Sequence, residues 1–319
     1  GPAIAAGNSV VLKPAETASL TLIRIAELAL EAGLPEGVLN VVTGRGAVAG
    51  EALALSMDVD VLVFTGSGPV GRRLLEYSAQ SNLKRVYLEL GGKSPSLVFD
   101  DVKDIAQAAK VTANGMFRNS GQVCVACSRL LVQRGIHDEF VAELAKAAGS
   151  LKVGDPLDMA THVGAINSER QLLQSLGFVE TAAKEGGSIH SGGGRILQET
   201  GGYYMEPTIV TDVGIGDTLA QKEVFGPVLA VSAFDTEEEA VAMANGTEYG
   251  LSSGVWTSDL SRAHRMIQSV RAGVVHVNTY GGSDLTVPLG GVKQSGNGHD
   301  KSLHAFDKYV DLKTAWIQL

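Results

Sequence analysis

The chain has 319 residues, of which 45% are hydrophobic and 19% charged, and its net charge at pH 7 is −9. This globular composition excludes a disordered chain, and the length allows about two domains of roughly 100–200 residues each. The acidic balance argues against nucleic-acid or membrane-surface binding, because both partners are polyanions. There is no apolar run of about 18 residues and no visible signal peptide. With only two cysteines, the composition predicts a cytoplasmic protein that binds neither nucleic acid nor membrane.

The first residues, GPAIAAGNSVVLKPAE, lack an initiator methionine and run directly into a strand-like segment. We therefore expect an N-terminally truncated chain that begins inside a fold.

The first third alternates predicted strands and helices. The β-branched run at 9–13 predicts a buried strand. The next segment, at 17–33, has apolar residues at helical spacing, and Thr17 or Ser19 can cap that helix. Further strands are predicted at 37–42, 59–64 and 84–90, with helices at 46–56 and 72–79. Strands separated by helices of this length predict parallel βαβ units.

A second domain is predicted from Gly92 onward. A strand at 94–99 is followed by a helix at 101–119, whose first turn is rich in carboxylates, favourable to the helix dipole. The remaining predicted elements are a strand at 128–133, helices at 136–151 and 168–185, a helix, loop and strand at 239–257, and an edge or exchanged strand at 310–319.

A glycine motif follows the strand at 59–64. Gly66, Gly68 and Gly71 match the G-x-G-x-x-G dinucleotide fingerprint, in which a helix N-terminus holds a pyrophosphate. By spacing alone, Glu89 is placed on the ribose, about 20 residues further on. Glu16, beside Lys13, competes for that role. A lone glycine motif is equally compatible with a structural turn.

The two cysteines, Cys124 and Cys127, lie three positions apart in NSGQVCVACSR. They allow three interpretations: a single nucleophile with a bystander, a pair that forms a disulfide, and a metal or thioredoxin-like site. A zinc site is disfavoured because no histidine lies nearby in the sequence and there is no second cysteine pair.

Seven stretches make the chain resemble the NAD(P)-dependent aldehyde dehydrogenase superfamily over nearly its whole length. They are GNSVVLKPAE, VLVFTGSGPVGRRL, LELGGKSP, RNSGQVCVACSR, YMEPTIV, KEVFGPVL and VPLGGVKQSGNG. The tail is most similar to the branch that oxidises γ-glutamyl-γ-aminobutyraldehyde and related ω-amino aldehydes.

The resemblance implies an α/β fold: a Rossmann-like NAD-binding domain, incomplete at its N-terminus, an α/β catalytic domain and a C-terminal oligomerisation strand. The corresponding ranges are 1–91, 92–294 and 295–319. It also implies that a Trp-Asn-Phe-Pro-like stretch with the oxyanion asparagine lies upstream. We therefore expect this piece alone to be inactive or poorly folded.

Site roles are carried over from the matching motifs. The resemblance makes Cys124 the nucleophile and Glu89 the general base. The role of binding the ribose is therefore assigned to Glu16, assisted by Lys13, and not to Glu89. The family's other cofactor contacts fall on Gly46, Gly66, Ser67, Val70, Leu90, Gly91, Glu223 and Phe225. Asn278 and Asp284 are weaker candidates for the substrate mouth.

The implied reaction is oxidation of an aldehyde to its acid. Cys124 attacks the aldehyde, hydride passes to NAD, and Glu89 activates the water that hydrolyses the thioester. Glu89 should then have a pKa raised toward neutrality by apolar neighbours. NAD is favoured over NADP, because the carboxylate of Glu16 repels a 2′-phosphate.

The expected partners are a small aldehyde substrate and further copies of the chain, in a homodimer or homotetramer, with no metal. Two alternatives stay open: a non-catalytic homologue with a structural or binding role, and a thiol–disulfide module on Cys124 and Cys127.

Overall fold

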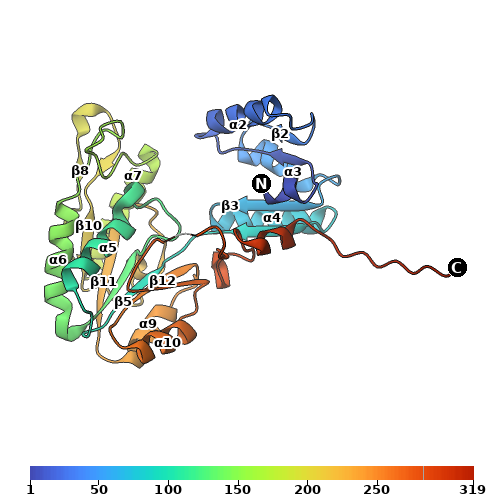
Figure 1. Cartoon of the computed structure of the whole chain (residues 1–319). Coiled ribbons are helices and arrows are strands. Elements are labelled where there is room, and N and C mark those ends of the chain that lie inside the picture. Colours follow the sequence, from blue (N-terminus) through green and yellow to red (C-terminus); the bar gives the residue numbers. More distant parts are fainter. Residues whose placement is uncertain (283) are drawn as a thin grey trace. The chain divides into compact units, whose positions relative to one another are not determined.

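A computed structural model describes residues 1–282 and 284–319. The chain forms two compact units, coloured along the sequence in Figure 1, and each is described by itself. Unit 1 combines Gly1–Glu89 with Asp284–Leu289 and Asn297–Leu319, and unit 2 combines Leu90–Ser283 with Gly290–Gly296. Both units mix helices with mostly parallel strands, which confirms the predicted α/β class.

Unit 1 contains two separate pairs of parallel strands, β1 with β2 and β3 with β4. Its elements are α1 Pro2–Ala5, β1 Val10–Leu12, α2 Ser19–Glu31, β2 Leu39–Val41, a π-helix Gly46–Gly50, α3 Glu51–Leu55, β3 Val61–Thr65, α4 Gly68–Gln80, β4 Arg85–Glu89 and a 3₁₀ helix Leu303–Lys308.

Two local predictions for unit 1 were wrong. The strand β1 is not buried: its central residue, Val11, has 47% of its surface exposed, and among the described strands β1 pairs with β2 alone. The N-cap of α2 is Ala18, and no side chain caps that helix, so neither Thr17 nor Ser19 has the predicted role.

Unit 2 is built on a seven-stranded sheet. Its elements are β5 Pro95–Val98, α5 Ile105–Phe117, a 3₁₀ segment Arg118–Gly121, β6 Arg129–Gln133, a 3₁₀ turn Arg134–Ile136, α6 His137–Gly149, α7 Glu169–Lys184, β7 Ser188–Ser191, β8 Arg195–Ile196, a 3₁₀ turn Gln198–Thr200, β9 Tyr204–Met205, β10 Thr208–Thr211, α8 Thr218–Gln221, β11 Val228–Phe234, α9 Glu237–Asn245, β12 Ser252–Trp256, α10 Leu260–Ser269, β13 Val274–Val277 and a 3₁₀ turn Lys293–Ser295.

The strand order in this sheet is β13-β12-β5-β6-β11-β10-β7, and only β7 runs antiparallel to its neighbour. Side chains alternate between the two faces, as the pleat of a strand requires. On one face, Val98, Leu130 and Leu229 pack against α5 and α6, which lie side by side in Figure 1. Their neighbours Leu97 and Leu131 point to the other face, toward α9 and α10.

The helix α5 begins later than predicted. Asp104 is its N-cap and accepts a hydrogen bond from the Gln107 N–H at 2.9 Å, so the first turn contains no acidic residue. The Asp104 side chain thus satisfies one of the free N–H groups in the first turn, which explains why the helix begins after Asp104 and not at 101.

Among the described residues, no helix is both long and apolar enough to cross a membrane.

A leucine pair tests the core of unit 2. Leu144, on α6, is fully buried between α5 and the sheet, whereas Leu157 is 88% exposed. We expect Leu144→Ala to lower the free energy of unfolding by about 2–5 kcal/mol, through lost burial and a cavity. Leu157→Ala should change it by less than about 0.5 kcal/mol. Urea unfolding followed by fluorescence measures both, and equal effects would contradict this packing.

Candidate active site

The carboxyl ends of β1 and β2 bring three predicted cofactor residues together in unit 1. Glu16 Oε1 accepts a hydrogen bond from the Gly46 N–H at 2.7 Å, and Glu16 Oε2 lies 3.7 Å from Lys13 Nζ. The pKa of Glu16 is lowered, first by its own backbone N–H, then by the Gly46 N–H and the Lys13 ammonium. The result is a half-exposed, charged carboxylate in a fixed position, which can accept hydrogen bonds from two vicinal hydroxyls.

The carboxyl ends of β3 and β4 carry the glycine motif and Glu89. The Gly66 N–H donates to the Glu89 carbonyl at 3.0 Å, so the motif begins directly beside Glu89. A side chain at Gly66 would enter the ring of Phe64. Ser67 is the N-cap of α4 but makes no side-chain cap, and Val70 lies in the first turn with 41% exposure. The start of this 13-residue helix therefore offers backbone N–H groups suited to a phosphate.

Glu89 itself is a perturbed acid. Its pKa is raised to about 7, mainly by burial and also by the nearby Asp300 carboxylate, while Lys308 opposes the rise. Lys308 is almost fully buried and forms an ion pair with Asp300. Within the described part of the chain, Glu89 Oε1 has no hydrogen-bond partner. A carboxyl group with a pKa near neutrality can both release and take up a proton at physiological pH.

In unit 2, the peptide at Gly91–Gly92 is enclosed by two other predicted site residues. The Gly92 N–H donates to Glu223 Oε1 at 3.1 Å. A side chain at Gly91 would collide with the Glu223 carboxylate, and one at Gly92 would collide with the Cys124 carbonyl. Leu90, Gly91, Cys124 and Glu223, which are far apart in the sequence, thus come together. Burial raises the pKa of Glu223, and the Gly92 N–H and Lys93 oppose that rise.

The segment before Cys124 has an unusual backbone. Asn119, Ser120 and Gly121 are consecutive residues with φ of 51°, 56° and 68°. A side chain at Gly121 would collide with the Gly226 carbonyl, and the neighbouring Phe225 also has a positive φ, 54°. Non-glycine residues in this region cost about 1–3 kcal/mol each, and they cluster at functional sites. The close approach of these two turns fixes the start of the Cys124 segment.

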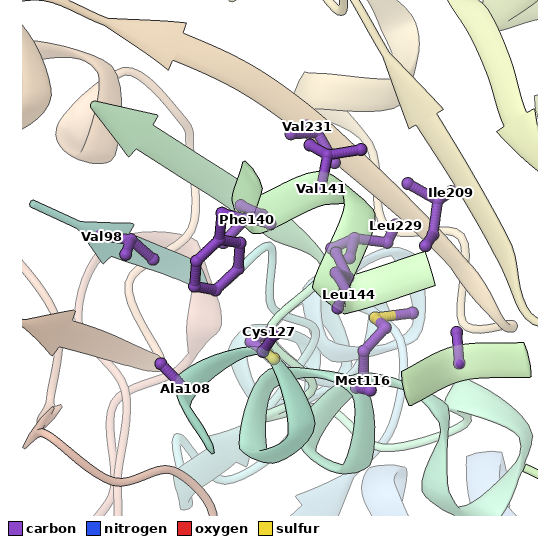
Figure 2. Packing of buried hydrophobic residues seen from close by; sticks show 14 of the residues in the cluster. Val98, Ala108, Met116, Cys127, Phe140, Val141, Leu144, Ile209, Leu229 and Val231 are labelled. Atoms are coloured by element: carbon purple, nitrogen blue, oxygen red, sulfur yellow. The ribbon is translucent and has the colours of Figure 1, made fainter. Parts of the chain in front are cut away.

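The two cysteines occupy different environments and form no disulfide. Cys124 is half-buried, whereas Cys127 is fully buried. The Cys127 thiol donates to the Thr112 carbonyl, with an Sγ–O distance of 3.4 Å, and lies in the core with Phe140 and Met116 (Figure 2). Burial raises the pKa of Cys127 to about 12. Cys127 is therefore a protonated core thiol, unsuited to nucleophilic attack at neutral pH.

Two buried residues that sequence reasoning did not select support the site. Ser295 is fully buried; its Oγ donates to the Gly91 carbonyl at 2.7 Å, and its carbonyl accepts the Leu90 N–H at 2.8 Å. Lys93 is 1% exposed, and burial, together with Arg129, lowers its pKa to about 7. Both lie in quoted motifs, GGKSP and KQSGNG, but their contacts depend on tertiary proximity.

The two candidate substrate residues have local partners. The side chain of Asn278 uses both polar atoms on Thr257: it accepts from the Thr257 N–H at 3.0 Å and donates to its carbonyl at 2.9 Å. Asp284 Oδ1 accepts from the Thr286 N–H and hydroxyl, both at 2.8 Å. Ser283, in the same predicted substrate loop, lies outside the described residues. Substrate contacts by Asn278 and Asp284 stay a prediction.

A cavity of about 640 Å³ lies elsewhere in unit 2, at the opposite end of the sheet from Cys124. Its lining includes Arg134, His137, Asp212 and Glu239, and none of the predicted site residues takes part in it. Over the described ranges, no group of three or more His, Cys, Asp or Glu side chains could hold a metal ion.

Comparison with known proteins identifies the class. The aldehyde dehydrogenase family profile matches residues 1–315. The chain belongs to the aldehyde dehydrogenase family.

Individual relatives agree with the branch named from the sequence. The chain is 50% identical to the NADP/NAD-dependent aldehyde dehydrogenase PuuC of Escherichia coli over 319 residues, which is 100% of this chain and 64% of that protein. A solved indole-3-acetaldehyde dehydrogenase in complex with NAD⁺ is 54% identical, with a TM-score of 0.98, over 100% of this chain and 64% of that one. A γ-glutamyl-γ-aminobutyraldehyde dehydrogenase from Burkholderia cenocepacia is 52% identical, with a TM-score of 0.95, over 98% and 63%. The chain thus spans about 64% of the length of these relatives.

The Asp300–Lys308 pair offers a test of the Glu89 environment. Asp300→Asn should lower the pKa of Glu89 because it removes a repelling charge, and Lys308→Met should raise it. The exposed Asp307→Asn is the control and should leave it unchanged. Carbon-13 NMR of labelled glutamate follows the titration, expected near pH 7 without substitution.

The raised pKa of Glu89 also predicts how the stability of the fold depends on pH. The folded chain binds the Glu89 proton more tightly than the unfolded chain, whose value is 4.5. The stability that this proton contributes is therefore lost as the pH rises through 7. A titration of Glu89 centred near 4.5, insensitive to Asp300, would contradict the buried environment described here.

Proposed function

We propose that the natural polypeptide containing this chain oxidises an aldehyde to the carboxylic acid with NAD, with Cys124 as nucleophile and Glu89 as general base. The observation that carries the proposal is the difference between the two cysteines. Cys127 is a buried thiol with its pKa raised to about 12, while Cys124 is partly accessible beside Gly92 and Glu223. This difference supports one nucleophile with a bystander and opposes a thiol–disulfide module.

NAD is the cofactor that the described residues fit. In unit 1, the fixed carboxylate of Glu16 with Lys13 suits a ribose diol, and the start of α4 at Gly66 and Ser67 suits a pyrophosphate. In unit 2, we assign Glu223 and Phe225 to the nicotinamide side, because Glu223 is a buried carboxylate held beside Gly91. When bound, NAD supplies the acceptor for the hydride of the substrate.

Each protein residue then has a distinct task. Cys124, as the thiolate, adds to the aldehyde carbon and later holds the acyl group as a thioester. The backbone N–H of Cys124 is a candidate donor to the developing oxyanion. Glu89 takes a proton from the water that hydrolyses the thioester, for which a pKa of about 7 is well matched to neutral pH.

The relatives support a proposal for the substrate class. The similarity to a γ-glutamyl-γ-aminobutyraldehyde dehydrogenase supports an ω-amino or γ-glutamylamino aldehyde. The similarity to an indole-3-acetaldehyde dehydrogenase makes an aromatic aldehyde the comparison substrate.

The C-terminal residues support a homo-oligomer. The segment after Tyr309 forms no helix or strand within the described chain, and its large apolar side chains are exposed, with Leu312 at 103% and Trp316 at 95%. We assign this segment to pairing with a second copy of the chain, which would cover those side chains.

A cysteine pair of variants tests the function. In the complete gene product, Cys124→Ala should reduce NADH formation at least about 10⁴-fold, as expected when a nucleophile is removed. Cys127→Ala, the matched control, should keep turnover within about threefold and cost about 1 kcal/mol of stability. Absorbance at 340 nm with 4-aminobutanal and indole-3-acetaldehyde measures the rates. Full turnover by Cys124→Ala would overturn the proposal; full loss in both variants would point to a unit of two thiols.

Glu16 tests the cofactor preference. Glu16→Gln removes a charge next to the ribose and should raise the ratio of kcat/KM for NADP to that for NAD about tenfold, equivalent to about 1.4 kcal/mol. Glu36→Gln, an exposed carboxylate in unit 1, is the control. An unchanged ratio of the two kcat/KM values would contradict the assignment of Glu16 to the ribose.

A further inference from the structure

Tyr280 is a buried residue that the proposed mechanism does not use. It follows β13 in unit 2, and its side chain is only 9% exposed. Its ring fills a slot between two glycines: a Cβ atom at Gly115 on α5 would lie 2.9 Å from the ring, and one at Gly254 on β12 would lie 2.8 Å from it. His276 closes a further side, with ring centroids 5.0 Å apart. The ring position is therefore set by its surroundings.

The hydroxyl of Tyr280 reaches the segment that contains Cys124. Its Oη donates a hydrogen bond to the Val125 carbonyl at 2.7 Å, across 155 residues of sequence. Val125 directly follows Cys124 in the chain, and residues 122–128 form neither helix nor strand. A local turn encloses Cys124 and Val125, with the Ala126 N–H donating to the Val123 carbonyl at 2.9 Å. The Tyr280 contact ties this turn to a distant part of unit 2.

The neighbours of Tyr280 belong to the same segment and its support. Cys127 Sγ lies 3.1 Å from a Cβ placed on Gly115, so it shares the slot with the ring. Ser94 and Ser252 are both at most 2% exposed, and neither hydroxyl has a hydrogen-bond partner within the described residues; Ser94 Oγ lies 3.5 Å from a Cβ placed on Gly92. Tyr280 consequently connects α5 and β12 to the residue after Cys124.

We propose that Tyr280 is a positioning residue for Cys124, whose hydroxyl fixes the Val125 carbonyl and thereby the direction of the thiol. The inference rests on the proposed role of Cys124 as nucleophile. A nucleophile must stand about 3–3.5 Å from the atom it attacks, and a displacement of 1 Å can cost about 100-fold in rate. Tyr280→Phe removes only the hydroxyl and keeps the ring in its slot.

The test uses the complete gene product. We expect Tyr280→Phe to lower the rate of the first turnover about 10- to 100-fold, while KM for NAD stays within twofold. The rate of Cys124 alkylation by iodoacetamide, measured across pH and per folded molecule, should fall as well. Tyr204→Phe is the matched control, because Tyr204 is a buried tyrosine of unit 2, at 8% exposure. It should leave both rates unchanged.

Two further arms separate the possible failures. Gly115→Ala pushes on the ring without removing a hydroxyl, and it should reproduce the slower alkylation even if Tyr280→Phe folds poorly. If Cys124→Ala abolishes turnover but Tyr280→Phe keeps the normal first-turnover and alkylation rates, the positioning role is wrong and the proposed function stands. If Cys124→Ala keeps full turnover, the proposed function itself fails. A lowered melting temperature with normal rates per folded Tyr280→Phe molecule would assign Tyr280 a purely structural role.

Discussion

The arrangement of unit 2 around Cys124 depends on the absence of side chains at Gly91 and Gly92. The peptide between them is enclosed by the Cys124 carbonyl and the Glu223 carboxylate, and any Cβ there would overlap one or the other. Close contact with this peptide thus fixes the spacing of three distant segments of the chain. Ser295 adds a fourth, through its hydroxyl on the Gly91 carbonyl. Short-range contacts of this kind transmit even small shifts, because packed interiors have few voids to absorb them.

Buried positive charge surrounds this turn, and the fold compensates for it with carbonyl groups. Arg129 is 1% exposed and has no carboxylate partner among the hydrogen bonds described; its guanidinium donates to the carbonyls of Lys93, Met243 and Ala244, at 2.8–3.0 Å. The last two carbonyls belong to the end of α9, where the helix dipole favours a cation. Lys93, deprived of water beside Arg129, loses its proton more easily than a surface lysine. The neighbouring Glu223 partly opposes this shift of the Lys93 pKa.

Local sequence signals predicted the elements well where burial is simple. Short apolar runs placed β3, β4 and β6 close to their observed positions, and apolar residues at helical spacing did the same for α6 and α7. They failed where the environment is set by distant parts of the chain: the run at 9–13 looks buried, yet Val11 is exposed. The G-x-G-x-x-G spacing located the glycine turn, and the sequence alone left Glu89 and Glu16 as competing candidates for the ribose. The family resemblance favoured Glu16, and that role stays a prediction. Ser295 and Tyr280 escaped because serine and tyrosine carry no periodic signal, and their contacts cross 155 or more residues.

The unequal burial of the two thiols makes their alkylation a probe of local opening in unit 2. Cys124 is half-buried, whereas Cys127 is fully buried among α5, α6 and the sheet, so a small alkylating reagent should modify Cys124 first. Mass spectrometry would therefore separate molecules with one added group from molecules with two. The time at which the second group appears reports the opening of the α5–α6 layer, in the way that amide exchange reports local unfolding. If Cys124 is modified completely beforehand, the rate of modification of Cys127 alone measures how often this core opens.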